Sequence, residues 1–231
     1  MLIYQSPNGY CYNSDSIFLI WFISRFSPKG RILDVGCGVG VIGLVLSREF
    51  NLTPSIVDIQ PHMIQYARHN YAIHDIEVEV YEGDFVKMEF ECKYDVIVSN
   101  PPFYCDGALK SKEPTLSLAR YASAMPFEEL CYRVHHTLTP QGRFYLCYDA
   151  KQIGHIICIL EKYHLRVEEI EFVHSKIAKE SKLVLLSCRH NGKSSTKIAP
   201  PFVVFDSDGE YSDDAKRAFR FASLHSIKGE R

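Results

Sequence analysis

Short apolar runs alternate along the chain with segments whose apolar residues recur at the spacing of one helix face. The runs that predict strands are RILDV (31–35), SIVD (55–58), IEVEVY (76–81), YDVIVS (94–99), GRFYLCY (142–148), VEEIEFV (167–173) and KLVLLSC (182–188). The segments that predict helices are 41–49, 61–71, 126–138 and 152–163. Pro61 and Pro126 stand in first helical turns, where proline is accepted because its missing N–H has no partner there. The pattern therefore predicts strands and helices in alternation.

The central strand candidates are apolar on both faces, as expected for strands that helices cover on both sides. Because crossovers between parallel strands are right-handed, the succession predicts an α/β fold with a doubly wound, mostly parallel sheet of seven strands. Ligands of such sheets bind at the carboxyl ends of the strands. We expect one domain over residues 1–231, with a helical lead-in at 1–30, a core at 31–189 and a C-terminal extension at 190–231.

Composition narrows the classes of partner. The 26 Lys and Arg residues nearly balance 28 Asp and Glu residues, so a nucleic acid would have to be held by a local basic patch.

The eight cysteines are scattered without a C-x-x-C pair, which suits a reducing cytosol. The sequence shows no secretory leader, and its most apolar stretch, residues 17–23, is too short to span a bilayer. The ten histidines form no metal-binding pattern, so we expect a cytoplasmic protein without a metal site.

A glycine-rich segment, LDVGCGVGVIG, follows the first strand candidate of the core and opens a helix. Glycines let the backbone approach a ligand closely, and a helix N-terminus offers unpaired N–H groups. Residues 38–43 satisfy the dinucleotide fingerprint G-x-G-x-x-G, and Asp58 follows where that fingerprint places a ribose-binding acid. An NAD-dependent oxidoreductase is therefore one open alternative.

Asp34 immediately precedes this loop and completes the pattern D-x-G-x-G-x-G with Gly36, Gly38 and Gly40. The pattern resembles the first motif of class I S-adenosylmethionine (SAM) dependent methyltransferases, whose fold is Rossmann-like. An acid at this position suits a ligand that carries an ammonium and a sulfonium, whereas it would repel a pyrophosphate. The resemblance implies that SAM is the cofactor and that these four residues bind it.

Asp58 and Asp84 each end an apolar run, so both carboxylates should project over the same crevice. In methyltransferases of this class such acids accept hydrogen bonds from the ribose hydroxyls and from the adenine amino group. The resemblance implies these roles for Asp58 and Asp84, and we expect Phe85 and Asp15 to complete the cofactor site.

Asn100-Pro101-Pro102-Phe103 ends the fourth strand of the core, because neither proline can donate a ladder hydrogen bond. The run resembles the (D/N/S)-P-P-(Y/F) motif of methyltransferases that act on amino groups of planar substrates. The Asn100 side-chain oxygen and the Pro101 carbonyl can each accept one N–H of an amino group and so aim its lone pair at a methyl group. Phe103 can stack on the base, and Pro102 stiffens the turn.

The N-terminal segment YQSPNGYCYNSDSIFLIWF resembles that of the bacterial tRNA(Val) adenine-N6 methyltransferase family, through Gly9, Tyr10 and Asp15. Ala119-Arg120-Tyr121 and Tyr211-Ser212 resemble further stretches of that family, whereas Cys11 and Ala122 depart from its pattern. The resemblance implies methylation of an adenine in tRNA, just 3′ of the anticodon.

Cationic and aromatic residues outside the motifs are candidates for binding the RNA. Those near the Asn-Pro-Pro turn are Tyr104, Lys110, Lys112 and Arg120, and those on a helix that Ser212 should cap are Lys216, Arg217 and Arg220. Two further alternatives stay open. One is a protein-glutamine or other amino-group methyltransferase that uses the same Asn-Pro-Pro turn, and the other is an RNA-binding protein without turnover.

Overall fold

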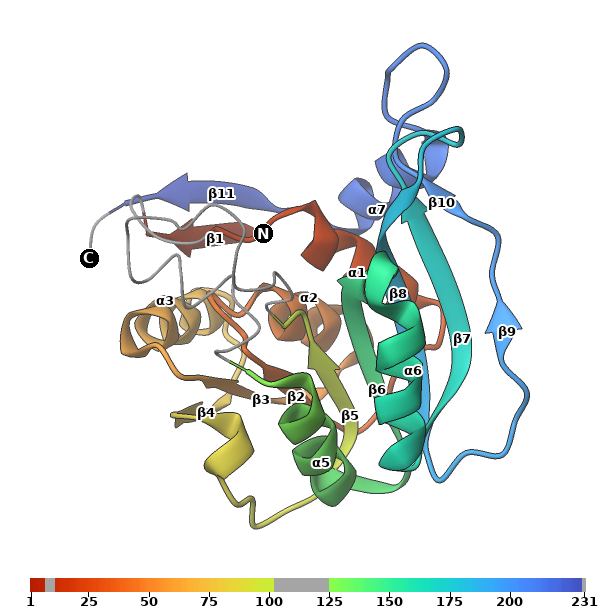
Figure 1. Ribbon diagram of the computed structural model, residues 1–231. Coiled ribbons are helices and arrows are strands. Elements are labelled where there is room, and N and C mark those ends of the chain that lie inside the picture. Colours follow the sequence, from red (N-terminus) through yellow and green to blue (C-terminus); the bar gives the residue numbers. More distant parts are fainter. Residues whose placement is uncertain (7–10, 102–124, 230–231) are drawn as a thin grey trace.

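The computed structural model describes residues 1–6, 11–101 and 125–229, and its centre is a twisted sheet with helices on both faces (Figure 1). The described strands of this sheet are β2 (Arg31–Val35), β3 (Thr53–Asp58), β4 (Glu79–Glu82), β5 (Tyr94–Ser99), β6 (Leu138–Asp149), β7 (Leu165–His174), β8 (Ser181–His190), β9 (Lys197–Ile198) and β10 (Phe202–Val203). Their order is β10-β7-β8-β6-β5-β2-β3-β4, and β9 also pairs with β7.

The fold class predicted from the sequence is confirmed. All seven predicted strands are present, and every pairing is parallel except those of β8 with β6 and β7. The described residues add two strands to the seven, β9 and β10, which lie in the C-terminal extension and pair with β7. They are only two residues long, so they leave no period in the sequence that could predict them.

Helices cover both faces of the sheet. The described α-helices are α1 (Ser14–Ser24), α2 (Val41–Phe50), α3 (Pro61–Ala72), α5 (Phe127–Thr137), α6 (Ile153–Lys162) and α7 (Asp213–Ala222), and the short 3-10 helices are η1 (Phe85–Lys87) and η3 (Ala150–Gln152). One apolar cluster joins α1, α2, α3 and α7 to one face of the sheet, and a second joins α5 and α6 to the other. The four predicted core helices are thereby confirmed.

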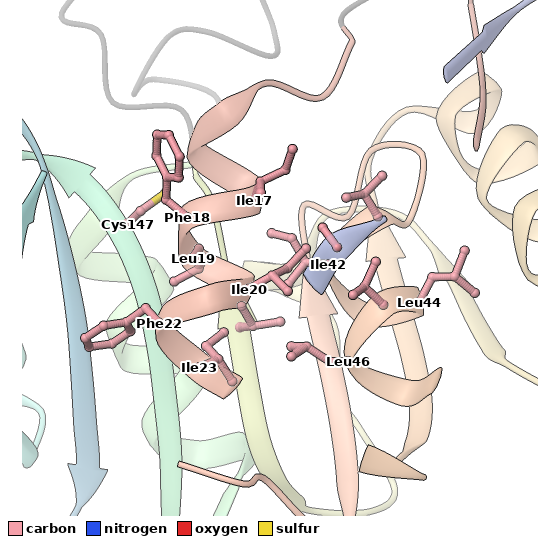
Figure 2. Packing of buried hydrophobic residues seen from close by; sticks show 14 of the residues in the cluster. Ile17, Phe18, Leu19, Ile20, Phe22, Ile23, Ile42, Leu44, Leu46 and Cys147 are labelled. Carbon is pink, nitrogen blue, oxygen red and sulfur yellow. The ribbon is translucent and has the colours of Figure 1, made fainter. Parts of the chain in front are cut away.

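The lead-in helix α1 is buried on nearly all sides. Its apolar residues pack against α2, whose Ile42, Leu44 and Leu46 belong to the same cluster (Figure 2). Arg25, directly after the helix, donates two hydrogen bonds of 2.9 and 3.0 Å to the carboxylate of Glu171 on β7. Each fully buried Ile, Leu or Phe contributes about 1.5–3 kcal/mol, so α1 is an integral part of the core.

A second sheet, which the sequence pattern did not predict, joins the two ends of the described chain. Strand β1 (Leu2–Gln5) pairs in parallel with β11 (His225–Lys228), beside α3 (Figure 1). Asn70 of α3 accepts a hydrogen bond from the Tyr4 N–H (2.8 Å) and donates one to the Tyr4 carbonyl oxygen (3.0 Å). Since Ile3 is fully buried, the pair adds both hydrogen bonds and apolar contact to the α3 side of the core.

Among the helices of the described residues, none has both the length and the apolar character needed to cross a membrane.

Candidate active site

The predicted site residues on strands β2, β3 and β5 meet at one edge of the sheet. Val35, the last residue of β2, is in register with Val57 of β3 and with Ser99 of β5. Gly36, Asp58 and Asn100 each follow one of these three residues, so they stand side by side at the carboxyl ends of neighbouring strands. This is the edge at which parallel α/β sheets bind ligands.

The glycine loop turns tightly between β2 and α2. Gly36, Gly38 and Gly40 have φ angles of 68°, 54° and 83°, which lie in the left-handed region that other residues enter only with strain. A β-carbon added at Gly38 would have no neighbour within 4 Å, whereas one at Gly40 would come within 3.0 Å of the Tyr71 ring. The backbone at Gly38 is therefore open to a ligand, and the backbone at Gly40 is packed against α3.

Asp34 lies on β2 beneath the loop and is 1% exposed. Its Oδ2 accepts a 2.9 Å hydrogen bond from the Gly43 N–H, while Oδ1 is buried and has no hydrogen-bond partner among the described residues. Burial raises the pKa of Asp34 to about 7, the Gly43 N–H opposes that shift, and the charge of Asp58 adds to it. A buried acceptor without a donor fits a ligand that brings a cationic group or an N–H.

Asp58 ends β3 and braces the loop from the other side. Its Oδ2 accepts a 2.8 Å hydrogen bond from the Gly38 N–H and its Oδ1 accepts one of 2.9 Å from the Gln60 N–H. Burial raises its pKa, and these two N–H donors partly offset the shift. Each carboxylate oxygen still has a lone pair for a hydroxyl group, so the predicted contact with ribose is compatible with the geometry.

The turn after β4 lies next to Asp58, because the Gly83 N–H donates to the Asp58 carbonyl oxygen (3.0 Å). Asp84 caps η1 through the Val86 N–H (3.3 Å) and forms an ion pair with Lys87 (2.9 Å). Phe85 is buried, with its ring 5.6 Å from that of Phe90, so its side chain is part of the core. The carboxylate of Asp84 therefore contacts Val86 and Lys87, whereas the side chain of Phe85 packs in the core.

Asn100 follows β5, and its carboxamide is held at both ends. Cys147 of β6 donates its S–H to Oδ1 at 2.8 Å, and Nδ2 donates to Oγ of Ser16 on α1 at 3.1 Å. The carboxylate of Asp15, one residue before Ser16, accepts a hydrogen bond from Asn13 Nδ2 (2.9 Å). Burial raises the pKa of both Asp15 and Cys147, and the negative charge of Asp15 adds to the shift of Cys147. The first turn of α1 is therefore part of this site.

The comparisons with known proteins agree with this arrangement. The profile of the methyltransferase small domain family matches residues 13–170, from the start of α1 into β7. The chain belongs to this family. A Phocaeicola vulgatus protein named tRNA1(Val) (adenine(37)-N6)-methyltransferase is 32% identical over 159 residues, which cover 68% of this chain and 68% of that protein. The NAD-dependent alternative is not favoured by these matches.

Solved structures show the fold of the enzyme. An Agrobacterium tumefaciens protein described as a predicted O-methyltransferase superposes with a TM-score of 0.70 at 14% identity, over 93% of this chain and 100% of that one. An O-methyltransferase of Brevibacillus brevis, solved in complex with S-adenosyl-L-homocysteine, superposes with a TM-score of 0.52 at 16% identity, over 69% of this chain and 54% of that one. The enzyme is a class I methyltransferase, and its cofactor is SAM.

The methyltransferase site also contains residues that the sequence analysis missed. Ile59 directly follows the buried Asp58 and is 43% exposed, although it is a large apolar residue. An exposed apolar side chain next to Asp58 offers a surface on which a flat ring could pack, and the signal was an aliphatic residue just after a strand-ending acid. Ser16 and Cys147 were also missed, because nothing in the local sequence connects either of them to Asn100.

Several predicted residues lie outside the described part of the chain. They are Pro102, Phe103, Tyr104, Lys110, Lys112 and Arg120, together with Gly9, Tyr10 and the stretch around Arg120. Pro101 is described and buried. On α7, Ser212 caps the helix by accepting from the Ala215 N–H (3.1 Å), as expected, and Lys216, Arg217 and Arg220 are exposed. This helix packs against α1 and β10.

Within the described residues, no group of three or more His, Cys, Asp and Glu side chains is arranged to hold a metal ion.

Proposed function

We propose that this methyltransferase transfers the methyl group of SAM to the N6 amino group of an adenine in tRNA. The observation that carries the proposal is the position of Asn100, at the carboxyl end of β5 and beside the strand that leads into the glycine loop. The similarity to a protein named tRNA1(Val) (adenine(37)-N6)-methyltransferase supports tRNA as the acceptor and adenine 37 of tRNA1(Val) as the position to test.

The proposed reaction depends on acceptors rather than on a strong base. An adenine N6 is a weak nucleophile because its lone pair is delocalised into the ring. Asn100 Oδ1 and the Pro101 carbonyl oxygen would each accept one N–H of this group, which draws the nitrogen toward tetrahedral geometry and fixes the direction of its lone pair. The nitrogen proton becomes acidic only after the methyl group has been transferred, so water can remove it.

The chain also provides groups that fit the cofactor. SAM supplies a methyl group on a positively charged sulfur, together with an ammonium, a ribose and an adenine. The unpaired Oδ1 of Asp34 and the open backbone at Gly38 would hold the charged part, while Asp58, Ile59 and Asp84 would contact the adenosine. These residues lie on one edge of the sheet, so the cofactor would bind beside Asn100.

The acceptor would have to leave its stack to reach Asn100, because N6 of a stacked and paired adenine is not accessible. Phe103 and Tyr104 are the proposed stacking residues, and Lys110, Lys112, Arg120, Lys216, Arg217 and Arg220 are the proposed phosphate contacts. All seven cysteines within the described residues are free, which agrees with a proposed cytoplasmic location, where tRNA is present.

The experiment that tests the proposal is transfer of tritium from methyl-labelled SAM to tRNA, other RNA, DNA and protein, each isolated from a strain that lacks the gene. Nucleoside mass spectrometry of the labelled fraction then identifies the product. We expect N6-methyladenosine in the tRNA fraction. Label in protein instead would select the protein-glutamine alternative, and well-folded protein that binds SAM but labels none of the fractions would contradict the proposed acceptor.

A further inference from the structure

The carboxamide of Asn100 has two different ends, and only one of them can accept a hydrogen bond. If the amide were turned by 180°, its NH2 group would face the substrate amino group, and two donors would oppose each other. A reaction that depends on an acceptor at this position therefore requires a fixed amide orientation. The free energy that separates the two orientations must come from the neighbours of Asn100.

Two neighbours hold the carboxamide, and one of them distinguishes its ends. Ser16 Oγ, on α1, accepts from Nδ2 at 3.1 Å. Cys147 Sγ, on β6, donates to Oδ1 at 2.8 Å. Both residues are buried, and Cys147 belongs to the same apolar cluster as the residues of α1 (Figure 2). Neither contact can be exchanged for a contact with bulk water. The Ser16 hydroxyl can accept from an NH2 group or donate to an oxygen, so it holds the amide in place, and the Cys147 thiol selects its orientation.

The chemistry of the thiol strengthens this preference. Sulfur is a weak acceptor, so Cys147 interacts better with an amide oxygen than with an NH2 group. Burial raises the pKa of Cys147 well above its usual value, and the charge of Asp15 adds to that shift. The thiol therefore keeps its proton at neutral pH and remains a donor. An amide oxygen has two lone pairs, so Oδ1 can accept the S–H and a substrate N–H together.

We propose that Ser16 and Cys147 are positioning residues that hold the Asn100 carboxamide with its oxygen toward the acceptor amino group. This inference rests on the proposed function, because it assigns a purpose to the amide orientation. It also gives α1 a role beyond packing. A lead-in helix that precedes the cofactor loop in sequence supplies one of the two contacts that hold the Asn100 carboxamide.

Steady-state kinetics with the full chain, labelled SAM and transcribed tRNA1(Val) test this role. Ser16→Ala and Cys147→Val each remove one contact that holds the Asn100 amide, and we expect each to lower kcat about three- to tenfold, since one modest hydrogen bond is lost. The Kd for SAM and the KM for tRNA should not change. Cys147→Ser keeps a donor and should retain most of the wild-type kcat.

Matched controls separate orientation from packing. Ser47→Ala on α2 and Cys188→Val on β8 make the same changes at other buried positions, and both variants should keep the wild-type kcat. In an Asn100→Asp background both terminal atoms of the side chain are oxygens, so its orientation no longer matters. Cys147→Val should then lower kcat by less than about twofold. Two results would overturn the positioning role. One is a wild-type kcat in both Ser16→Ala and Cys147→Val, and the other is a Cys147→Val effect on kcat that is as large in the Asn100→Asp background as in the wild type.

An infrared measurement makes the result independent of turnover. The S–H stretch of Cys147, identified by its loss in Cys147→Val, should lie at the lower frequency of a hydrogen-bonded thiol and move to higher frequency in Asn100→Ala. A band that does not respond to Asn100→Ala contradicts the contact, whatever the acceptor proves to be. If the band shifts between wild type and Asn100→Ala as expected but the wild-type protein methylates no RNA, the result contradicts the proposed function instead.

Discussion

Asn70 of α3 donates a 2.9 Å hydrogen bond to the carbonyl oxygen of Val39 in the glycine loop. The same carboxamide pairs with both backbone groups of Tyr4 on β1, so one fully buried side chain connects the second sheet to the cofactor loop. The conformation of the loop is thus determined partly by a side chain that also holds β1, a strand of the second sheet.

Replacement of Asn70 should affect both stability and cofactor binding. Asn70→Ala removes hydrogen bonds to three backbone groups, of which the Val39 carbonyl is buried, so we expect the free energy of unfolding to fall by about 2–4 kcal/mol. The loop should also become less ordered, which weakens SAM binding. Denaturant titration and calorimetry with SAM measure the two effects. A destabilised variant with the wild-type Kd for SAM would restrict Asn70 to anchoring β1.

Gly43 should not tolerate alanine, although alanine is the better helix former. A β-carbon at Gly43 would lie 2.6 Å from the Tyr71 hydroxyl oxygen and 3.2 Å from the Asp34 β-carbon. We expect Gly43→Ala to lower the free energy of unfolding by about 1–3 kcal/mol, as measured in urea.

A matched helical glycine provides the control for Gly43. A β-carbon at Gly154 in α6 would meet nothing within 4 Å, so Gly154→Ala should be stabilising by about 0.5–1 kcal/mol. Adding Tyr71→Phe to Gly43→Ala removes the nearest atom and should recover part of the loss. Equal effects of the two glycine substitutions would argue against close packing beneath the loop.

Asp34 should make stability depend on pH. Its folded-state pKa is raised from 3.8 to about 7, so between these values the folded state binds the proton that the unfolded state has lost. The free energy of unfolding should therefore decrease as the pH rises from about 4 to about 7, by up to about 1.4 kcal/mol per pH unit. Asp34→Asn removes this contribution, so the stability of the variant relative to wild type should rise with pH and level off above about 7. A constant difference between about pH 4 and pH 8 would contradict a raised pKa.

The pair between Arg25 and Glu171 should also be sensitive to pH. Burial raises the pKa of Glu171, and Arg25 opposes that shift. Arg25→Met leaves the carboxylate without its main cation, so its pKa should rise further. Because Arg25 is partly exposed and screened by solvent, the protein should lose about 1–2 kcal/mol of stability at pH 8. The loss should be smaller near pH 5, where Glu171 can take up a proton. Adding Glu171→Gln should restore most of the stability at the higher pH.

Asn100 should be needed for transfer but not for cofactor binding. We expect Asn100→Ala to lower kcat by about 100-fold or more, because an acceptor for the target amino group is removed. The Kd for SAM should stay near the wild-type value, since the residue would contact the acceptor. Rapid-quench transfer assays and calorimetry measure both quantities. An active Asn100→Ala enzyme would refute the assigned role.

The core of the fold could be predicted because its signals are local. Strands β2 and β5 begin and end where their apolar runs do, and Ser212 caps α7 as its side chain suggested. The convergence of Gly36, Asp58 and Asn100 followed from one topological rule, that the carboxyl ends of parallel strands meet at one edge.

The missed features depend on contacts between distant parts of the chain. β1 has only four residues, and its partner strand lies at the other end of the chain, so no local period marks either strand. Ser16 and Cys147 contact Asn100 across 84 and 47 residues of sequence. Asn70 looks like a polar residue of an ordinary helix until both of its partners are known. Such contacts appear only once the helices and strands have been assembled.

During translation, β1 leaves the ribosome long before its partner strand is made, because Met1 and its hydrogen-bond partner Ser223 are 222 residues apart. For most of synthesis β1 thus has an unpaired edge, which on a growing polypeptide is a site for wrong association. Asn70 can engage both backbone groups of Tyr4 as soon as α3 has formed and can hold the strand in the meantime. Only when residues 225–228 emerge can β11 pair with β1, so the surroundings of the cofactor loop mature after the whole of the nine-stranded sheet has been made.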